Sequence, residues 1–297
     1  MKILFVIPPY FNVDDFVNKQ RESILPAFTI PYGILSLEAY LKGCCETEVE
    51  TSILDLNIPL KEYLDQEDLH DNIVELLIGK VTERVAQFSP QLVGISALFN
   101  SSFRYIEDIA TAIKNVNQSV TVVAGGGLPS AAFEKMLEFC PSIDAICKGE
   151  GEMPLKELID SEDWTSLLET HASWITKKGL AQEKLPQHSF VQDLDDIPVL
   201  NYGIVNLDNY NSRSIDKRYT GEKKREMSIH TSRGCPFLCV FCSNPSLHGR
   251  DVRTMSIDRV VNEVRRMKEE YGMTVLMIED DHFFHDIERA KEIMRRL

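Results

Sequence analysis

The sequence predicts an α/β protein: an N-terminal doubly wound parallel sheet, followed by the start of a partial (βα) barrel. Two observations predict this architecture. Short apolar, β-branched runs alternate five times with helical patterns within the first 160 residues, an order that requires a parallel sheet with helices on both faces. A second strand–helix–strand–helix series runs from Glu226 to Leu297.

The first part contains five expected strands, and the first of them is a continuous β-branched and apolar run, which is typical of a strand buried on both faces of a parallel sheet. They are expected at Ile3–Ile7, Glu48–Asp55, Leu92–Ser96, Val120–Ala124 and Asp144–Cys147. Apolar residues at helical spacing predict helices over Ile34–Lys42, 68–88, Phe103–Asn115, Ala131–Cys140 and Met153–Asp160. Ligands of such sheets bind beyond the carboxyl ends of the strands, where the strand order reverses. The loops beginning at Pro8, Ser96, Gly125 and Gly149 are therefore candidate binding loops.

The second part opens with the alternating strand Glu226–Thr231. Its remaining elements are a helix capped by Ser256 and ended by Gly272, then a strand and a second helix: Arg259–Tyr271, Thr274–Ile278 and Asp286–Leu297. We therefore expect domains at 1–185 and 226–297, joined by a linker over 186–225. Two strands bury little and leave an open edge, so we expect a truncated chain, a fragment, or a barrel completed by another polypeptide.

The composition and the distribution of apolar residues indicate a globular protein. The chain of 297 residues has a net charge of −14 and is 43% hydrophobic, which is typical of a globular protein and argues against nucleic acid as the main partner. The apolar run after Met1 is too short for a signal peptide, and no run approaches the length of a membrane span. The seven cysteines are not spaced as a secreted disulfide framework, so we expect a cytoplasmic protein with reduced thiols.

Three cysteines follow the strand Glu226–Thr231 in a C-x3-C-x2-C spacing: Cys235, Cys239 and Cys242. Thiolates select iron–sulfur clusters, zinc or cuprous copper. Three thiolates on a four-iron cluster leave one iron without a protein ligand, an arrangement suited to a reaction. Zinc, with His230 or His248 as the fourth ligand, and buried structural thiols are the alternative interpretations.

Polar residues also follow the strand Thr274–Ile278. Glu279 and Asp280 lie at its carboxyl end, at the same barrel mouth as the cysteine loop. A carboxylate at this position could accept hydrogen bonds from a cationic amino group, and capping of the next helix by Asp281 or Asp286 is the alternative. The glycine triplet Gly125–Gly127 likewise has two interpretations: close approach of a bulky cofactor to the main chain, or a plain strand-to-helix turn.

The cysteine loop, with Phe241 just before its last cysteine, resembles the cluster loop of the radical S-adenosylmethionine (SAM) superfamily. The segments 124–130, 148–152 and 193–198 resemble the branch with an N-terminal cobalamin-binding domain. The resemblance implies a 4Fe-4S cluster on the three cysteines near Phe241, with SAM chelated at the fourth iron. It also implies that the SAM amine contacts the end of the second strand, at Glu279 or preferably Asp280.

For the first domain, the same resemblance implies cobalamin near Ser96, Gly125, Gly126 and Gly127. One departure is informative: cobalamin domains that bind cobalt through histidine carry D-x-H-x-x-G in the first strand–helix loop, and residues 8–15 contain no histidine. Either cobalamin binds without a histidine axial ligand, or the fold persists without the cofactor.

The function implied by the resemblance is reductive cleavage of SAM to a 5′-deoxyadenosyl radical, with methyl transfer to an unactivated carbon or phosphorus centre of a small-molecule substrate. An electron donor such as flavodoxin or ferredoxin is the implied partner. Radical cyclisation or rearrangement without methyl transfer is one alternative. A non-catalytic cobalamin- or metal-binding fragment is the other.

Overall fold

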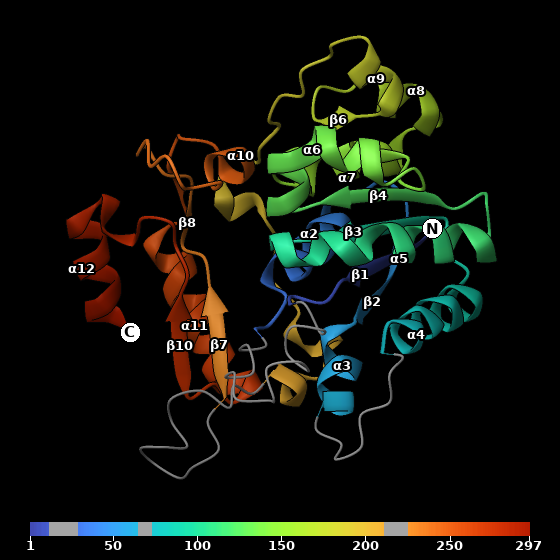
Figure 1. The fold of residues 1–297 in the computed structure, drawn as a ribbon. Coiled ribbons are helices and arrows are strands. Elements are labelled where there is room, and N and C mark those ends of the chain that lie inside the picture. The colour runs from blue at the N-terminus through green and yellow to red at the C-terminus, as the bar shows by residue number, and fades with distance from the viewer. Residues whose placement is uncertain (12–28, 65–72, 211–224) are drawn as a thin grey trace. The chain divides into compact units, whose positions relative to one another are not determined.

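The computed structural model describes residues 1–11, 29–64, 73–210 and 225–297 (Figure 1). Internal contacts divide the chain into two compact units, Met1–Pro26 with Cys44–Phe190, and Ala27–Gly43 with Val191–Leu297. We call them unit 1 and unit 2. Residues 27–43 therefore group with the C-terminal unit and not with the rest of the predicted first domain, 1–185.

Unit 1 is built on a six-stranded sheet with the order β2-β1-β3-β4-β5-β6. Its strands are β1 (Lys2–Ile7), β2 (Glu50–Asp55), β3 (Leu92–Ser96), β4 (Thr121–Gly125), β5 (Ala145–Cys147) and β6 (Trp174–Ile175). The first five pair in parallel, and β6 adds an antiparallel edge. The chain passes from β1 to β2 on one side and then to β3 on the other, so the strand order reverses between β1 and β3. The doubly wound α/β fold is confirmed.

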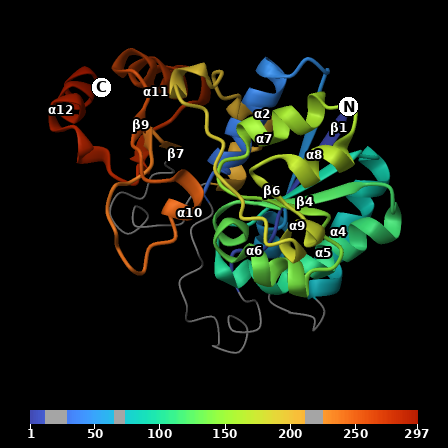
Figure 2. The same ribbon diagram turned by 90° about the horizontal axis from the view of Figure 1, so that it is seen from above.

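Helices cover both faces of this sheet: α4, α5 and α6 lie on one face and α7 on the other (Figure 2). The helices of unit 1 are α3 (Asn57–Leu64), α4 (Ile73–Phe88), α5 (Phe103–Val116), α6 (Gly127–Phe139), α7 (Glu152–Asp160), α8 (Trp164–Thr170) and α9 (Lys177–Ala181). The first turn of α6 begins before the predicted Ala131 and ends in a kink at Ala132. The predicted helix over 68–88 is described from Ile73 onward.

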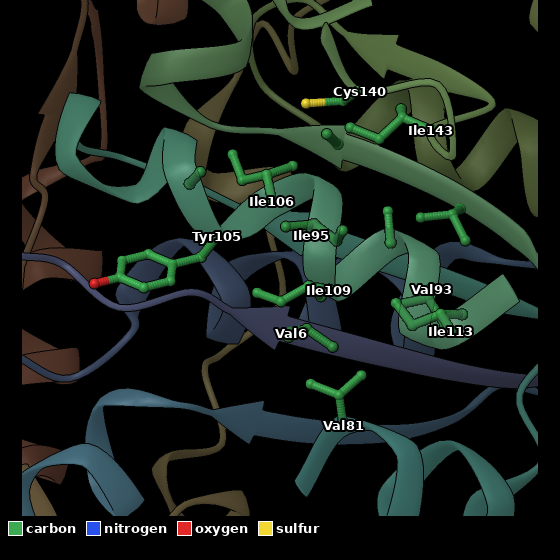
Figure 3. Close-up of a cluster of buried hydrophobic side chains, with 14 of the residues drawn as sticks. Val6, Val81, Val93, Ile95, Tyr105, Ile106, Ile109, Ile113, Cys140 and Ile143 are labelled. Carbon is green, nitrogen blue, oxygen red and sulfur yellow. The ribbon is translucent and has the colours of Figure 1, made fainter. Parts of the chain in front are cut away.

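The core of unit 1 lies between the sheet and helices α4, α5 and α6 (Figure 3). Val6, Val93 and Ile95 point from alternate positions of β1 and β3 toward the helices, as the two-residue period of a strand requires. Ile109 meets them from α5 and is 1% exposed. Side chains on the other face of β1, such as Phe5, are equally buried, which explains why the strand is a continuous apolar run.

Unit 2 contains a parallel strand pair, β7 (Glu226–Ile229) and β10 (Val275–Ile278). The other elements of this unit are α2 (Tyr32–Cys44), β8 (Ser232–Arg233), α10 (Pro245–His248), β9 (Arg253–Thr254), α11 (Ile257–Tyr271) and α12 (Ile287–Arg296). The predicted end of α11 at Tyr271 is confirmed, and the helix begins at Ile257, two residues before the predicted Arg259. The Ser256 side chain accepts a hydrogen bond from the backbone of Arg259, and Gly272 adopts the left-handed conformation that ends the helix.

Among the described residues, no helix has both the length and the apolar character needed to cross a membrane.

Replacing Ile109 by Ala should lower the free energy of unfolding of the chain by about 2–5 kcal/mol, because it leaves a cavity in a packed core. Val116, on the same helix but 36% exposed, provides the control, and Val116→Ala should change stability by no more than about 0.5 kcal/mol. Urea unfolding followed by circular dichroism measures both variants. Equal effects of the two substitutions would contradict the placement of this core.

Candidate functional site

The cysteine loop follows β8 in unit 2. Its three thiols are free; Cys239 and Cys242 are exposed and Cys235 is half-buried. The amide of Cys242 donates to the carbonyl of Cys239 at 3.1 Å, forming a turn, and the Phe241 side chain is 88% exposed. Among the described residues, no three His, Cys, Asp or Glu side chains are gathered closely enough to hold a metal ion. Three unpaired thiols on one short loop nevertheless form the donor set that a cluster with one open iron requires.

The segment leading into this loop is fixed by backbone geometry. Gly234 has a φ of +93°, and a side chain there would collide with the carbonyl oxygen of Asp251. Only glycine fits such a position without strain. The Gly234 amide donates to Asp281 Oδ2 at 3.3 Å, and the Cys235 amide donates to the carbonyl of Gly249 at 3.4 Å. The chain therefore turns sharply just before its first cysteine.

The acidic end of β10 lies beside this segment because β7 and β10 are parallel neighbours. Asp280 accepts three hydrogen bonds: from the amide of Thr231 at 2.5 Å, from Thr231 Oγ1 at 2.6 Å and from Ser232 Oγ at 2.7 Å. The Asp280 carboxylate, expected from the resemblance to contact SAM, thus binds Thr231 and Ser232, which shortly precede the cysteine loop.

Glu279 has different partners. Its carboxylate lies 3.6 Å from His230 Nε2. The interaction with His230 lowers the pKa of Glu279, burial raises it, and a hydrogen bond from Ser228 lowers it further, so that the pKa lies below its usual value. The His230 ring packs against Tyr32 of α2 with centroids 4.7 Å apart. The Arg233 guanidinium also reaches α2, donating to Ser36 Oγ at 2.9 Å. Helix α2 therefore contacts residues that precede and follow Thr231 in the sequence, His230 and Arg233.

One residue of this site, Arg289 of α12, was not predicted from the sequence. Its Nη2 donates to the carbonyls of Thr231 and Met255, at 2.9 Å each, and its Nη1 donates to Thr231 Oγ1 at 3.3 Å. Only a weak signal in the sequence pointed to this residue: Arg289 is a cation in the first turn of a helix that follows the acidic end of a strand.

In unit 1, the predicted residues Ser96 and Gly125 stand side by side across β3 and β4. Gly126, with a φ of +99°, and Gly127 lie against the neighbouring backbone, since a side chain at either would meet the carbonyl oxygens of Ala97 (2.7 Å) or Leu98 (3.2 Å). A Cβ atom at Gly125 would lie no closer than 3.8 Å to its nearest neighbour, the Cβ of Cys147. Packing of two strand ends therefore explains Gly126 and Gly127, and only Gly125 has room beside its main chain.

The loop after β1 is held at the point where the strand order reverses. Buried Asn57 accepts from the amide of Tyr10 at 2.8 Å and donates to the carbonyl of Pro8 at 3.1 Å, while Ser102 Oγ donates to the carbonyl of Pro9 at 2.8 Å. The Tyr10 ring packs edge-on against Phe99 with centroids 5.3 Å apart.

This edge of the sheet also presents apolar side chains. Leu98 and Phe99 follow β3 and are 49% and 50% exposed. Both follow the carboxyl end of β3, beside the strand β4 that ends at Gly125. Apolar and aromatic side chains predominate in ligand-binding sites.

Two family models match the chain in sequence. The B12 binding domain model matches residues 25–159, and the radical SAM superfamily model matches residues 229–297. Between them the two matches cover most of the chain, and the second begins at the end of β7 and includes the cysteine loop.

Curated relatives match across both parts. An uncharacterized methyltransferase of Pyrococcus horikoshii is 29% identical over 100% of this chain and 57% of its own length. The cytidylyl-2-hydroxyethylphosphonate methyltransferase of Streptomyces wedmorensis is 27% identical over 91% of the chain and 54% of its own length. An anaerobic magnesium-protoporphyrin IX monomethyl ester cyclase of Cereibacter sphaeroides is 27% identical over 68% of the chain and 32% of its own length. The chain spans about half the length of the first two relatives.

Among solved structures, the radical SAM methyltransferase TsrM of Kitasatospora setae, with a tryptophan substrate and a SAM analogue bound, matches with a TM-score of 0.66 at 22% identity. The match covers 99% of this chain and 50% of that one, which shows that the folds agree. Together the two family models show a B12 binding domain followed by a radical SAM domain, as the three-cysteine loop and the segments before it predict.

Proposed function

We propose that this chain is the cofactor-binding part of a cobalamin-dependent radical SAM methyltransferase. The observation that carries the proposal is the cysteine loop, which follows β7 and β8 and whose preceding residue, Gly234, binds Asp281 just beyond the end of β10, in a chain that also contains a B12 binding domain. The similar methyltransferases support methyl transfer as the reaction.

In this proposal Cys235, Cys239 and Cys242 would hold a 4Fe-4S cluster, which would leave one iron open to SAM. Together these groups would supply reductive cleavage of the sulfonium of SAM to methionine and a 5′-deoxyadenosyl radical. The protein positions and shields these groups. The half-buried Cys235 is fixed at its amide, whereas Cys239 and Cys242 are exposed. An external donor such as flavodoxin or ferredoxin would supply the electron, and a small molecule would be the substrate.

Cobalamin is assigned to unit 1, at the carboxyl edge of β1, β3 and β4, where Leu98 and Phe99 are exposed and the main chain at Gly125 is open. This is the position at which doubly wound sheets bind ligands. Because residues 8–15 contain no histidine, we propose that the cofactor binds without an imidazole from this loop.

Ring formation without methyl transfer is a second candidate, supported by the similarity to a magnesium-protoporphyrin monomethyl ester cyclase. The two candidates share the cysteine loop and the sheet edge. They differ in whether the methyl group leaves SAM.

The fate of SAM separates them. In the reconstituted and reduced protein, a methyltransferase removes a methyl group from SAM and should release S-adenosylhomocysteine, which chromatography detects. A cyclase should release only 5′-deoxyadenosine and methionine. Formation of 5′-deoxyadenosine with no S-adenosylhomocysteine would overturn the methyltransferase proposal in favour of the second candidate.

Replacing Cys239 by Ala should abolish both cluster binding and SAM cleavage, because each thiolate holds one iron. After anaerobic reconstitution the unaltered chain should be brown and contain about four irons, and the variant should lose most of them. Cys44→Ala is the matched control, since Cys44 lies outside the loop and should leave the iron content unchanged. A colourless, zinc-containing protein would contradict the proposal.

Replacing Phe99 by Ala should weaken cobalamin binding about tenfold, because truncating a half-exposed aromatic side chain removes apolar contact with the ligand. Phe88→Ala is the control: that ring lies by Lys2, which begins β1, at the opposite end of the sheet. Corrinoid absorbance retained after gel filtration measures both variants. Equal retention by the Phe99 variant and the unaltered chain would place the corrinoid elsewhere.

A further inference from the structure

We propose that Asp280, Thr231 and Arg289 form a clamp that fixes the segment leading into the cysteine loop, and that Asp280 is a positioning residue for this loop. The role differs from the SAM contact expected from the sequence. The clamp is a property of the protein without cofactors, and its consequence for the cluster rests on the proposed function.

The hydroxyl of Thr231 joins the two charged partners. It donates its single proton to Asp280 Oδ2 at 2.6 Å and lies 3.3 Å from the donating Arg289 Nη1. A hydroxyl has one proton and two lone pairs, so both interactions are satisfied together. The main chain of the same residue is held as well, with its amide on Asp280 and its carbonyl on Arg289.

The hydroxyl groups in this arrangement are buried, so the loss of a hydrogen-bond partner is costly. Thr231 is 0% exposed and Ser232 is 3% exposed, so no ligand in solution reaches either hydroxyl. Hydrogen bonds to charged groups are the stronger class, and a buried polar group that loses its partner bears the full cost of its desolvation. Removing one member should therefore loosen the segment as a whole.

The Asp280 carboxylate has limited capacity for a further ligand. An ionised carboxylate offers about four lone-pair positions, and three are used by Thr231 and Ser232. All three donors belong to the segment that precedes Cys235 by a few residues. The geometry therefore assigns this carboxylate chiefly to the protein's own chain.

The clamp reaches the cysteine loop through a short and constrained connection. Only Ser232, Arg233 and Gly234 separate Thr231 from Cys235. Arg233 pairs with Arg253 across β8 and β9, and the Gly234 amide donates to Asp281. Fixing Thr231 consequently fixes where the first cysteine begins.

Hydrogen exchange in the full chain without cofactors tests the clamp directly. Thr231→Val removes the hydroxyl while keeping the shape of the side chain, and should speed exchange of the Thr231 and Gly234 amides about tenfold. Thr231→Ser keeps the hydroxyl and should leave that exchange near its original rate. Peptides from β1 serve as an internal reference, since they lie in unit 1 and should be protected equally in all variants.

Iron retention links the clamp to the loop. After anaerobic reconstitution and gel filtration, Thr231→Val and Asp280→Asn should both hold substantially less iron than the unaltered chain and Thr231→Ser. Glu288→Gln, a neutralised and exposed acid on α12, is the charge control and should retain all of it.

Different results would contradict the clamp, the positioning role of Asp280 and the proposed function. Unchanged exchange in Thr231→Val would overturn the clamp. Full iron retention by Asp280→Asn together with loss of SAM binding would restore the direct SAM role and overturn the positioning role. Absence of iron from the unaltered chain would refute the proposed function, while the exchange measurement would still decide whether the clamp exists.

Discussion

Parallel strand pairing is the constraint on which both candidate sites depend. In a parallel sheet every strand points the same way, so the loops that follow neighbouring strands gather at one edge. In unit 2 the pairing of β7 with β10 brings Thr231 and Asp280, distant in sequence, within hydrogen-bonding distance. In unit 1 the pairing of β3 with β4 sets Ser96 beside Gly125. Neither arrangement would survive an antiparallel partner at the same position.

The strands and long helices could be predicted because their signals are local. A continuous apolar run gave the observed bounds of β3 (Leu92–Ser96), and Ser256 and Gly272 marked the ends of α11. The short helices α8 and α9 were missed because so few residues carry little periodic signal. The grouping of α2 with unit 2 was also missed. It depends on contacts such as Arg233 with Ser36, which are 197 residues apart.

The site residues divide in the same way. A spacing motif identifies the three cysteines, whereas the partners of Thr231 depend on which strands pair and therefore required the structure. The glycine triplet is intermediate. Its presence after a strand was visible, but the reason for Gly126 and Gly127 is the carbonyl oxygens of Ala97 and Leu98. Three glycines in a row can thus serve internal packing at two positions and leave room for a ligand at one.

The residues before Cys235 are ordered and those after it are exposed, and this difference matters because ordering a chain costs conformational entropy. Fixing a residue's backbone costs about 1–2 kcal/mol in conformational entropy, and three thiolates must converge on one centre for a cluster to bind. Residues before Cys235 are buried and hydrogen-bonded, whereas Val240 and Phe241 beyond it are almost fully exposed. Because the residues before Cys235 are already ordered, fewer residues have to become ordered when the metal binds. The hydrogen bonds to Asp280 and Arg289 hold the residues immediately before the ligand loop, and this order reduces the ordering that metal binding requires.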